Sequence, residues 1–210
     1  MDIKLFKEQF DQILANYVEK KITQATQLLG DKRLNSFVEY IHSFIFAGGK
    51  RIRPYCVRAM YIGFGGKQEQ EMLEFAMVFE LFHTFALIHD DIIDQADKRH
   101  NGATMHMFIA DKIGHENFHI AEGQAMLIGD LLLAWVYELR NSHPRFSQQL
   151  LEEAKQNVHS MIEEVILGQM IDVDMMTGGE VTPELLEKKN TYKTASYTFV
   201  RPLLTGAILA

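Results

Sequence analysis

The chain has little of what stabilises small secreted domains or marks flexible linkers. Its single cysteine, Cys56, excludes an internal disulfide and fits a reducing compartment. Four prolines are few, and no Pro-rich or Gly/Ser-rich stretch divides the sequence. We therefore predict one domain over residues 1–210, located in the cytoplasm.

Excess positive charge and long apolar runs are also lacking. The net charge is −7 at pH 7, which argues against nucleic acid as a partner because a polyanion would meet no overall basic surface. The first eight residues are charged too often for a signal peptide. The apolar run from Ala125 to Val136 is interrupted by Gly129-Asp130 and is too short to cross a bilayer. We expect no integral membrane segment.

What the sequence does have is apolar residues at helical spacing almost throughout, without the alternation typical of strands. This pattern predicts helices over about residues 6–29, 34–47, 54–63, 68–94, 115–140, 146–175 and 183–210, with a polar loop over residues 95–112. A glycine C-cap is expected at Gly48-Gly49, and Thr182-Pro183 predicts a helix start. The fold class is therefore predicted to be an all-α bundle.

Three aspartates, Asp90, Asp91 and Asp94, end the most apolar of these helices. Asp90 and Asp94 are one turn apart and share a face. Acidic groups at this end of a helix repel one another and meet the negative end of the helix dipole. A divalent cation would relieve the repulsion, and hard oxygen ligands suit Mg²⁺. The alternative is a solvated acidic helix end, which fits less well after so apolar a helix.

A basic turn, Gly48-Gly49-Lys50-Arg51-Ile52-Arg53-Pro54, places three cations within four positions at the start of a helix. Backbone N–H groups at a helix start and fixed Lys and Arg side chains are typical of a diphosphate site. The alternative is a plain basic turn without a ligand.

Further side chains could also donate hydrogen bonds to phosphate oxygens. His83 lies seven residues before the first aspartate, on nearly the same helix face. It is either a core histidine with one hydrogen bond or a donor to a phosphate oxygen. Arg99 and His100 add cationic capacity just past the aspartates, and Lys193-Thr194 adds a lysine and a hydroxyl.

In this order, the motifs resemble those of trans-type polyprenyl diphosphate synthases from about residue 45 to the end of the chain. The shared elements are the basic turn at residues 48–54, Asp-Asp-x-x-Asp at residues 90–94, Arg99, Gly129-Asp130, Gly168-Gln169-x-x-Asp172 and Lys193-Thr194. The resemblance implies an isoprenoid-synthase-type helical bundle around a central cavity and a homodimer. It also implies Mg²⁺ as cofactor, with isopentenyl diphosphate and allylic prenyl diphosphates as substrates.

The resemblance also implies a role for each candidate residue. Mg²⁺ would be held by Asp90, Asp91 and Asp94, with Asp90 and Asp94 as the direct ligands. The remaining assignments are Arg99, Gln169, Lys193 and Thr194 for the allylic diphosphate, Lys50, Arg53, His83 and His100 for isopentenyl diphosphate, and Asp172 for orienting neighbours such as Lys193. Positive charge would stabilise the departing diphosphate while a dry cavity protects the allylic carbocation.

Product length is expected to depend on the residues before the aspartates: Phe79, Phe82, Phe85 and Ala86. Family members with an aromatic residue five positions before the first aspartate tend to make short products, and Phe85 holds that position. Ala86 leaves the next position open. The resemblance therefore implies a geranylgeranyl (twenty-carbon) product, with farnesyl (fifteen-carbon) as the alternative. All three phenylalanines could instead be ordinary core residues.

The sequence departs from the family pattern in two places. His100 stands where the family usually has a second arginine. The chain also stops before the second Asp-rich motif of the family, so we expect a C-terminally incomplete member that is inactive as it stands. The alternative is a noncatalytic regulatory subunit of a heteromeric synthase, against which the retained substrate residues argue.

Parts of the sequence also match motifs of two other enzyme classes. Residues 115–119 read His-Glu-x-x-His, the helix-borne motif of zinc hydrolases, but no third ligand follows, and we interpret the match as coincidence. A class I terpene cyclase would share the Asp-rich motif and the bundle. The basic turn argues against it, because a cyclase binds only one diphosphate.

Overall fold

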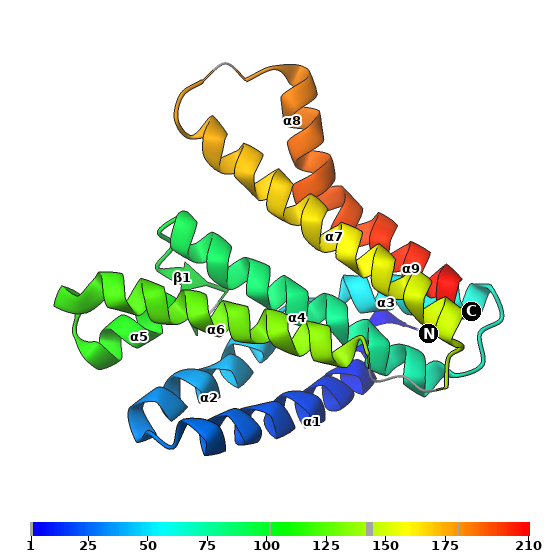
Figure 1. Ribbon diagram of the computed structural model, residues 1–210, viewed down its shortest axis with the longest axis horizontal. Helices are drawn as coiled ribbons and strands as arrows, with labels where there is room; N and C mark the ends of the chain where they lie inside the picture. Colours follow the sequence, from blue (N-terminus) through cyan, green and yellow to red (C-terminus); the bar gives the residue numbers. More distant parts are fainter. Residues whose placement is uncertain (1, 101, 142–144, 180) are drawn as a thin grey trace. The chain divides into compact units, whose positions relative to one another are not determined.

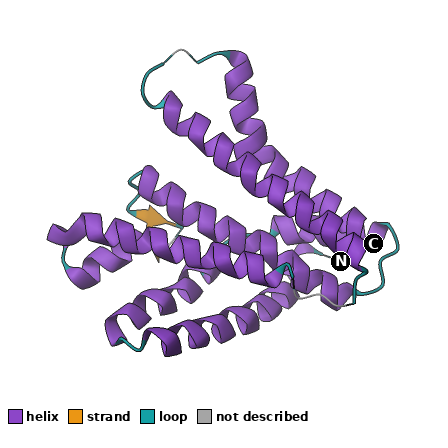
Figure 2. Cartoon of the chain, viewed as in Figure 1, coloured by secondary structure: helices purple, strands orange, loops and turns teal. Residues whose placement is uncertain are grey.

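Helices predominate in the computed structural model, which describes residues 2–100, 102–141, 145–179 and 181–210 (Figures 1 and 2). The helices are α1 (Ile3–Leu29), α2 (Lys32–Phe46), α3 (Ile52–Gly63), α4 (Glu69–Ile93), α5 (Met105–Ile113), α6 (Phe118–Leu139), α7 (Gln148–Met175), α8 (Pro183–Asn190) and α9 (Arg201–Leu209). A 3₁₀ turn, η1 (His115–Asn117), precedes α6, and a π-helix, η2 (Thr191–Val200), joins α8 to α9. The predicted all-α fold is confirmed.

Local capping chemistry explains where several helices begin and end. Gly30 ends α1 in the left-handed conformation at φ +62°, and the Thr182 side chain accepts the Leu185 N–H at the start of α8. The prediction of a glycine C-cap on α2 is wrong. Ala47 caps this helix in the right-handed conformation, and the left-handed turn falls two residues later at Gly49, φ +94°.

The predicted polar loop over residues 95–112 is also partly wrong, because it contains α5 and a short hairpin. Strands β1 (Lys98–Arg99) and β2 (Gly102–Ala103) pair antiparallel, and Tyr40 of α2 donates to the Ala103 carbonyl at 2.9 Å. The Tyr40 ring stacks on Phe108 of α5 at 3.7 Å. The apolar stripe of α5 is short, so packing on α2 stabilises a helix that its own periodicity predicts weakly.

Residue contacts divide the chain into two compact units, and each is described by itself below. Unit 1 comprises Met1–Lys50 and Glu80–Glu138, and unit 2 comprises Arg51–Phe79 and Leu139–Ala210. Helix α4 therefore contributes its first part to unit 2 and its second part to unit 1. The prediction of a single domain stays a prediction.

Unit 1 contains the hairpin of α1 and α2, the second part of α4, α5 and α6 (Figure 1). The buried stripe of α1 follows helical spacing at Phe6, Phe10 and Leu14. Further along α1, Lys21 donates to Glu138 of α6 at 2.6 Å. The stem of this largely buried lysine covers apolar surface while its ammonium group is paired.

Unit 2 is organised around α7, which packs on α8, η2 and α9 (Figure 1). The Asn157 amide of α7 donates to the Arg201 carbonyl and to the Thr205 hydroxyl, each at 2.8 Å. Glu164 of α7 pairs with the Arg201 guanidinium and accepts the Ser196 hydroxyl at 2.6 Å. The Asn157 and Arg201 contacts hold α9 against α7, and the Ser196 contact holds the π-helix η2 there.

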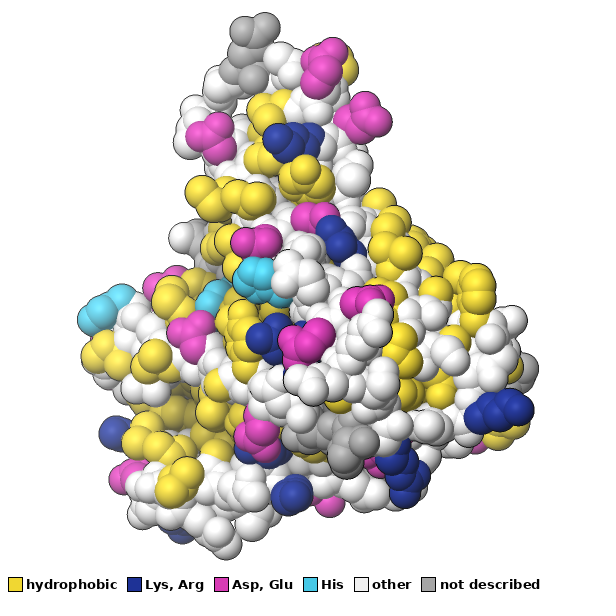
Figure 3. All heavy atoms as spheres, turned by 45° about the vertical axis from the view of Figure 1, so that its right-hand side comes forward, with side chains coloured by type: hydrophobic (Ala, Val, Ile, Leu, Met, Phe, Trp, Pro, Cys, Tyr) yellow, Lys and Arg dark blue, Asp and Glu magenta, His cyan; other side chains and the backbone are white. Residues whose placement is uncertain are grey.

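Hydrophobic side chains also reach the surface, where Figure 3 shows them among charged ones. Within the described residues, Glu69–Ile93 and His115–Leu139 are long and apolar enough to cross a membrane by length and composition alone. The most apolar window is 72% buried in the first segment and 39% buried in the second. The first is thus mostly a core helix, as the sequence predicts. The expected absence of a membrane segment stays a prediction.

Candidate functional site

The end of α4 presents two of its three aspartates at the surface of unit 1. The Asp94 N–H bonds to the Asp90 carbonyl at 2.8 Å, so the helical turn continues through Asp94 before Gln95 ends it at φ +52°. Asp90 and Asp94 therefore lie one turn apart on one face, as predicted. The Asp90 side chain is 22% exposed, and Asp94 is exposed. Both carboxylates are accessible from the solvent side of the helix.

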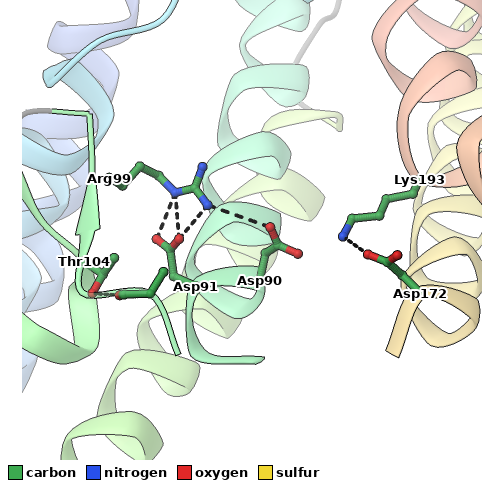
Figure 4. Close-up of polar contacts among 7 residues, drawn as sticks. Asp90, Asp91, Arg99, Thr104, Asp172 and Lys193 are labelled. Carbon is green, nitrogen blue, oxygen red and sulfur yellow. Dashed lines mark hydrogen bonds and ion pairs between the residues drawn. The ribbon is translucent and has the colours of Figure 1, made fainter. Parts of the chain in front are cut away.

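Asp91 has a different environment (Figure 4). Its side chain is 1% exposed and accepts from Arg99, with Nε at 2.8 Å and 3.0 Å from the two oxygens and Nη2 at 2.5 Å from Oδ1. Burial raises the pKa of Asp91, and the Arg99 guanidinium opposes that rise in part. Burial lowers the pKa of Arg99, but Asp91, Asp90 and Asp94 outweigh it and raise this pKa overall. Asp91 thus orients Arg99, whose Nη2 lies 3.8 Å from Asp90.

A hydrogen bond and a close side-chain contact fix the loop after α4 beside these residues. The buried Thr104 donates its hydroxyl to the Ala96 carbonyl at 2.7 Å. His100 takes a left-handed backbone at φ +53°, and its ring lies against Gly48, where an added Cβ would be 2.8 Å from the imidazole. His100 and the exposed Lys50 therefore lie near one glycine turn. The other predicted donor in this unit, His83, is half-buried on α4.

The acidic residues of unit 1 suit a hydrated cation better than a fully enclosed one. In residues 2–100, 102–141, 145–179 and 181–210, no three His, Cys, Asp or Glu side chains are grouped so that they could hold a metal ion. Asp91 is buried against Arg99, whereas Asp90 and Asp94 are the two carboxylates that reach the solvent-facing side of the helix. Mg²⁺ is usually bound by one or two carboxylates together with waters and substrate phosphates. The donor set therefore fits Mg²⁺ bound together with a phosphorylated ligand.

Unit 2 contains a second group of candidate residues, centred on Asp172 of α7 (Figure 4). Lys193 of η2 pairs with Asp172 Oδ2, which is the contact that the sequence predicts, and Lys189 of α8 lies 3.2 Å from Oδ1. Burial raises the pKa of Asp172, but hydrogen bonds from the two lysines outweigh it and lower this pKa overall. Asp172 is therefore ionised and holds both ammonium groups. Gln169 is half-buried and Thr194 is exposed.

Arg53 also belongs to unit 2, on α3. Its guanidinium lies 4.2 Å from the ring centroid of Tyr197, and Nη2 donates to the Thr198 hydroxyl at 3.1 Å. The Arg53 Nε is buried without a hydrogen-bond partner. The residue is thus oriented by the π-helix, and its assigned role toward isopentenyl diphosphate stays a prediction.

Comparison with known proteins identifies the family to which this chain belongs. The model of the polyprenyl synthetase family matches residues 31–210, most of the chain. The chain belongs to the polyprenyl synthetase family. It is 30% identical over 202 residues to a chloroplastic geranylgeranyl pyrophosphate synthase of Capsicum annuum, covering 92% of this chain and 51% of the relative. It is 32% identical to the farnesyl diphosphate synthase of Bacillus subtilis, covering 78% of this chain and 53% of the relative.

Solved polyprenyl synthetases have the same helical fold. One is a geranylgeranyl pyrophosphate synthase from Corynebacterium glutamicum complexed with isoprenyl diphosphate and magnesium. It matches with a TM-score of 0.85 and 28% identity, over 100% of this chain and 60% of that chain. The chain spans about half the length of the curated relatives it matches.

Two contacts of this polyprenyl synthetase chain are not predicted by its sequence motifs. One is the pairing of Lys189 with Asp172, for which the only signal is the position of Lys189 four residues before Lys193. The other joins His89 of α4 to α6, where His89 Nε2 lies 3.2 Å from the Met126 carbonyl oxygen. The missing side chain of Gly129 makes room for the His89 ring, which explains structurally why a glycine stands there.

The aromatic residues before the aspartates are all buried. Phe79 and Phe82 have no exposed surface, whereas Phe85 retains 8% and Ala86 is half-buried. The Phe85 ring lies 5.5 Å from that of Phe82 and 4.5 Å from the His89 ring. Phe79 and Phe82 therefore pack as core residues, and the influence of all four residues on product length stays a prediction.

The His-Glu-x-x-His sequence does not form the helical motif of zinc hydrolases. His115 and Glu116 lie in the 3₁₀ turn η1, and His119 lies in α6. His115 instead bonds to Asp111 at 2.8 Å. The two histidines are thus not presented by one continuous α-helix, which agrees with the interpretation of the match as coincidence.

The approach of η2 to α7 depends on Gly168, which leads to a prediction. A Cβ at this position would lie 2.5 Å from the backbone nitrogen of Lys193. We expect Gly168→Ala to reduce the free energy of unfolding by about 2 kcal/mol, since the backbone has to move to relieve the overlap. Urea unfolding measures this effect.

Gly123→Ala is the matched control, because Gly123 lies inside α6 with open space at its Cβ position. This substitution should stabilise the protein by roughly 0.5–1 kcal/mol through helix propensity. An equal stabilisation by Gly168→Ala would show that no close approach exists there.

Proposed function

We propose that the protein carrying this chain catalyses the Mg²⁺-dependent head-to-tail condensation of isopentenyl diphosphate with an allylic prenyl diphosphate, giving geranylgeranyl diphosphate. The observation that carries the proposal is the difference in burial and pairing among the three aspartates at the end of α4. Asp90 and Asp94 are accessible on one helix face, while the buried Asp91 fixes Arg99 beside them. Family membership and the magnesium and isoprenyl diphosphate in the Corynebacterium glutamicum structure support it.

In unit 1, Asp90 and Asp94 would hold Mg²⁺, which when bound supplies positive charge to the leaving diphosphate. Arg99 donates to the allylic diphosphate with the guanidinium that Asp91 holds in place. Lys50, His83 and His100 are assigned to the diphosphate of isopentenyl diphosphate. A histidine at position 100 is a weaker and more pH-dependent phosphate ligand than the usual arginine.

In unit 2, Lys193, Thr194 and Gln169 are assigned to the allylic diphosphate, and Arg53 to the second diphosphate. Asp172 keeps the Lys193 ammonium group in place. These cations bind diphosphate more tightly as it departs, because negative charge then grows on its oxygens. The double bond of isopentenyl diphosphate attacks the allylic carbon, and the released diphosphate takes up the proton that is lost. No protein nucleophile is needed.

The test is the reaction of the full-length gene product with isopentenyl and allylic diphosphates. Diphosphate release is expected with Mg²⁺ and should disappear with a chelator. Chromatography of the product distinguishes a twenty-carbon chain from the fifteen-carbon chain that similarity to the Bacillus subtilis enzyme suggests. Absence of diphosphate release, together with co-purification of a second and active synthase, would favour a regulatory subunit instead. A cytoplasmic homodimer without nucleic acid is part of the proposal, checked by fractionation and light scattering.

The length of the product is expected to depend on the size of the side chain at position 85. We expect Phe85→Leu to lengthen the product, since a smaller side chain five positions before Asp90 leaves room for further isoprene units. Phe85→Ala should lengthen it more, but it also removes a buried aromatic ring at a cost of roughly 3 kcal/mol or more in folding. Chromatography of the products of both variants measures the effect.

The Phe75→Leu variant is the control for a general packing defect, and its product should keep the unmodified length. Phe75 is a fully buried phenylalanine on the same helix, with no assigned role in product length. If Phe85→Leu is active and makes a product of unchanged length, Phe85 does not determine chain length.

A further inference from the structure

Lys189 contacts Asp172, but none of the roles proposed above includes Lys189. Its Nζ lies 3.2 Å from Asp172 Oδ1, while Lys193 pairs with Oδ2 of the same carboxylate. Each oxygen of Asp172 thus receives one ammonium group. The side chains of Lys189, Lys193 and Asp172 are 21%, 24% and 20% exposed, so all three charges are largely removed from water but reachable.

The cluster of Lys189, Lys193 and Asp172 has a net positive charge, which suits an anionic ligand. One carboxylate and two ammonium groups sum to one positive charge. The Asp172–Lys193 pair is complete without Lys189, and two lysines four residues apart on a helix repel each other. The second lysine thus adds a like charge beside Lys193, and a ligand with several anionic oxygens would bind both ammonium groups.

The position of Lys189 near the end of α8 does not explain it. Lysines are common in the last turn of a helix because they offset the negative end of the dipole. Here the chain continues directly from α8 into η2 and α9, and the Thr191 N–H still bonds to the Glu187 carbonyl. The last turn of α8 is thus not a free helix end.

The backbone that carries the two lysines is fixed in advance. Gly168 lets the backbone at Lys193 approach α7 closely, and Ser196 donates to Glu164 at 2.6 Å one turn further along. A π-helical stretch such as η2 is frequently found at functional sites. Because the segment is already ordered, little conformational entropy is lost when an anion binds the lysines.

From these contacts we infer that Lys189 is a second diphosphate-binding lysine of unit 2, acting with Lys193 on the same anion while Asp172 spaces the two ammonium groups. The inference rests on the proposed function, because it names a further binding residue for the diphosphate assigned to Lys193. The ligand class is an inorganic or prenyl diphosphate.

Calorimetric titration of the protein with inorganic pyrophosphate tests this inference. Lys189→Met should weaken binding about tenfold, the effect of losing one charge-assisted hydrogen bond, and Lys189→Arg should restore most of it. Lys193→Met should weaken binding at least as much. The matched control is Lys188→Met, which removes the same charge from the exposed neighbouring position and should change the affinity by less than about twofold.

The outcomes separate this inference from the proposed function. If Lys193→Met weakens binding and Lys189→Met does not, Lys189 is only a structural tie between α7 and α8, and the inference is wrong while the proposed function stands. A lower melting temperature of Lys189→Met at unchanged affinity has the same meaning. Equal losses in Lys188→Met and Lys189→Met would reduce the effect to general charge and also overturn the inference. If the unmodified protein does not bind pyrophosphate, the proposed function fails at this site as well.

Discussion

Asp90→Asn is expected to lower kcat/KM of the full-length gene product about a thousandfold, corresponding to ~4 kcal/mol of lost transition-state stabilisation. Asparagine preserves the size of the side chain but removes the charge that would hold Mg²⁺ beside the leaving diphosphate. The loss should persist at saturating substrate, because the charge acts mainly as the diphosphate departs. Diphosphate release at a fixed Mg²⁺ concentration measures it.

Asp97→Asn is the control for this prediction. Asp97 is an exposed acid three residues beyond the Asp-rich motif, so the substitution removes the same charge from the same region. It should leave the rate within about twofold of the unmodified protein. Equal rates for Asp90→Asn and Asp97→Asn would contradict the assignment of Asp90 to the metal.

Arg99→Met should reduce the free energy of unfolding by about 3 kcal/mol. The substitution leaves the Asp91 carboxylate buried without the guanidinium that donates to both of its oxygens. The double variant Asp91→Asn with Arg99→Met should recover part of the loss, since an amide carries no charge to desolvate. Urea unfolding of the three proteins measures these differences.

The deficit of Arg99→Met should also depend on pH. The pKa of Asp91 is already raised by burial in the presence of Arg99. A carboxyl group with a raised pKa in the folded state contributes stability that is complete at low pH and is lost as the pH rises through that pKa. Without Arg99 this pKa rises further, so the deficit should be larger at about pH 8 than at about pH 5.

Lys98→Met is the matched control for Arg99→Met. Lys98 is the exposed neighbouring residue in the same strand, and losing its charge should change stability by less than about 0.5 kcal/mol. If both variants lose the same amount at both pH values, the Asp91–Arg99 pair does not stabilise the fold.

The helices were predictable where local signals agree. A buried stripe at helical spacing and a left-handed glycine mark α1, and a threonine cap followed by proline marks α8. Local signals failed for α5, whose apolar stripe is short and depends on Tyr40 stacking on Phe108 from another helix. They also misplaced the cap of α2, because the helix ends at Ala47 in the right-handed conformation and the left-handed turn falls later, at Gly49.

By itself, the sequence determined the helical class, the family and the residue types of the candidate site, because these depend on spacing along the chain and on motif order. Only the tertiary structure separated the buried Asp91 from the accessible Asp90 and Asp94, and only it brought Lys189 to Asp172. The physical reason is that burial and pairing depend on which distant segments pack together. Adjacent aspartates in a sequence have the same chemistry until packing removes water from one of them and gives it an arginine.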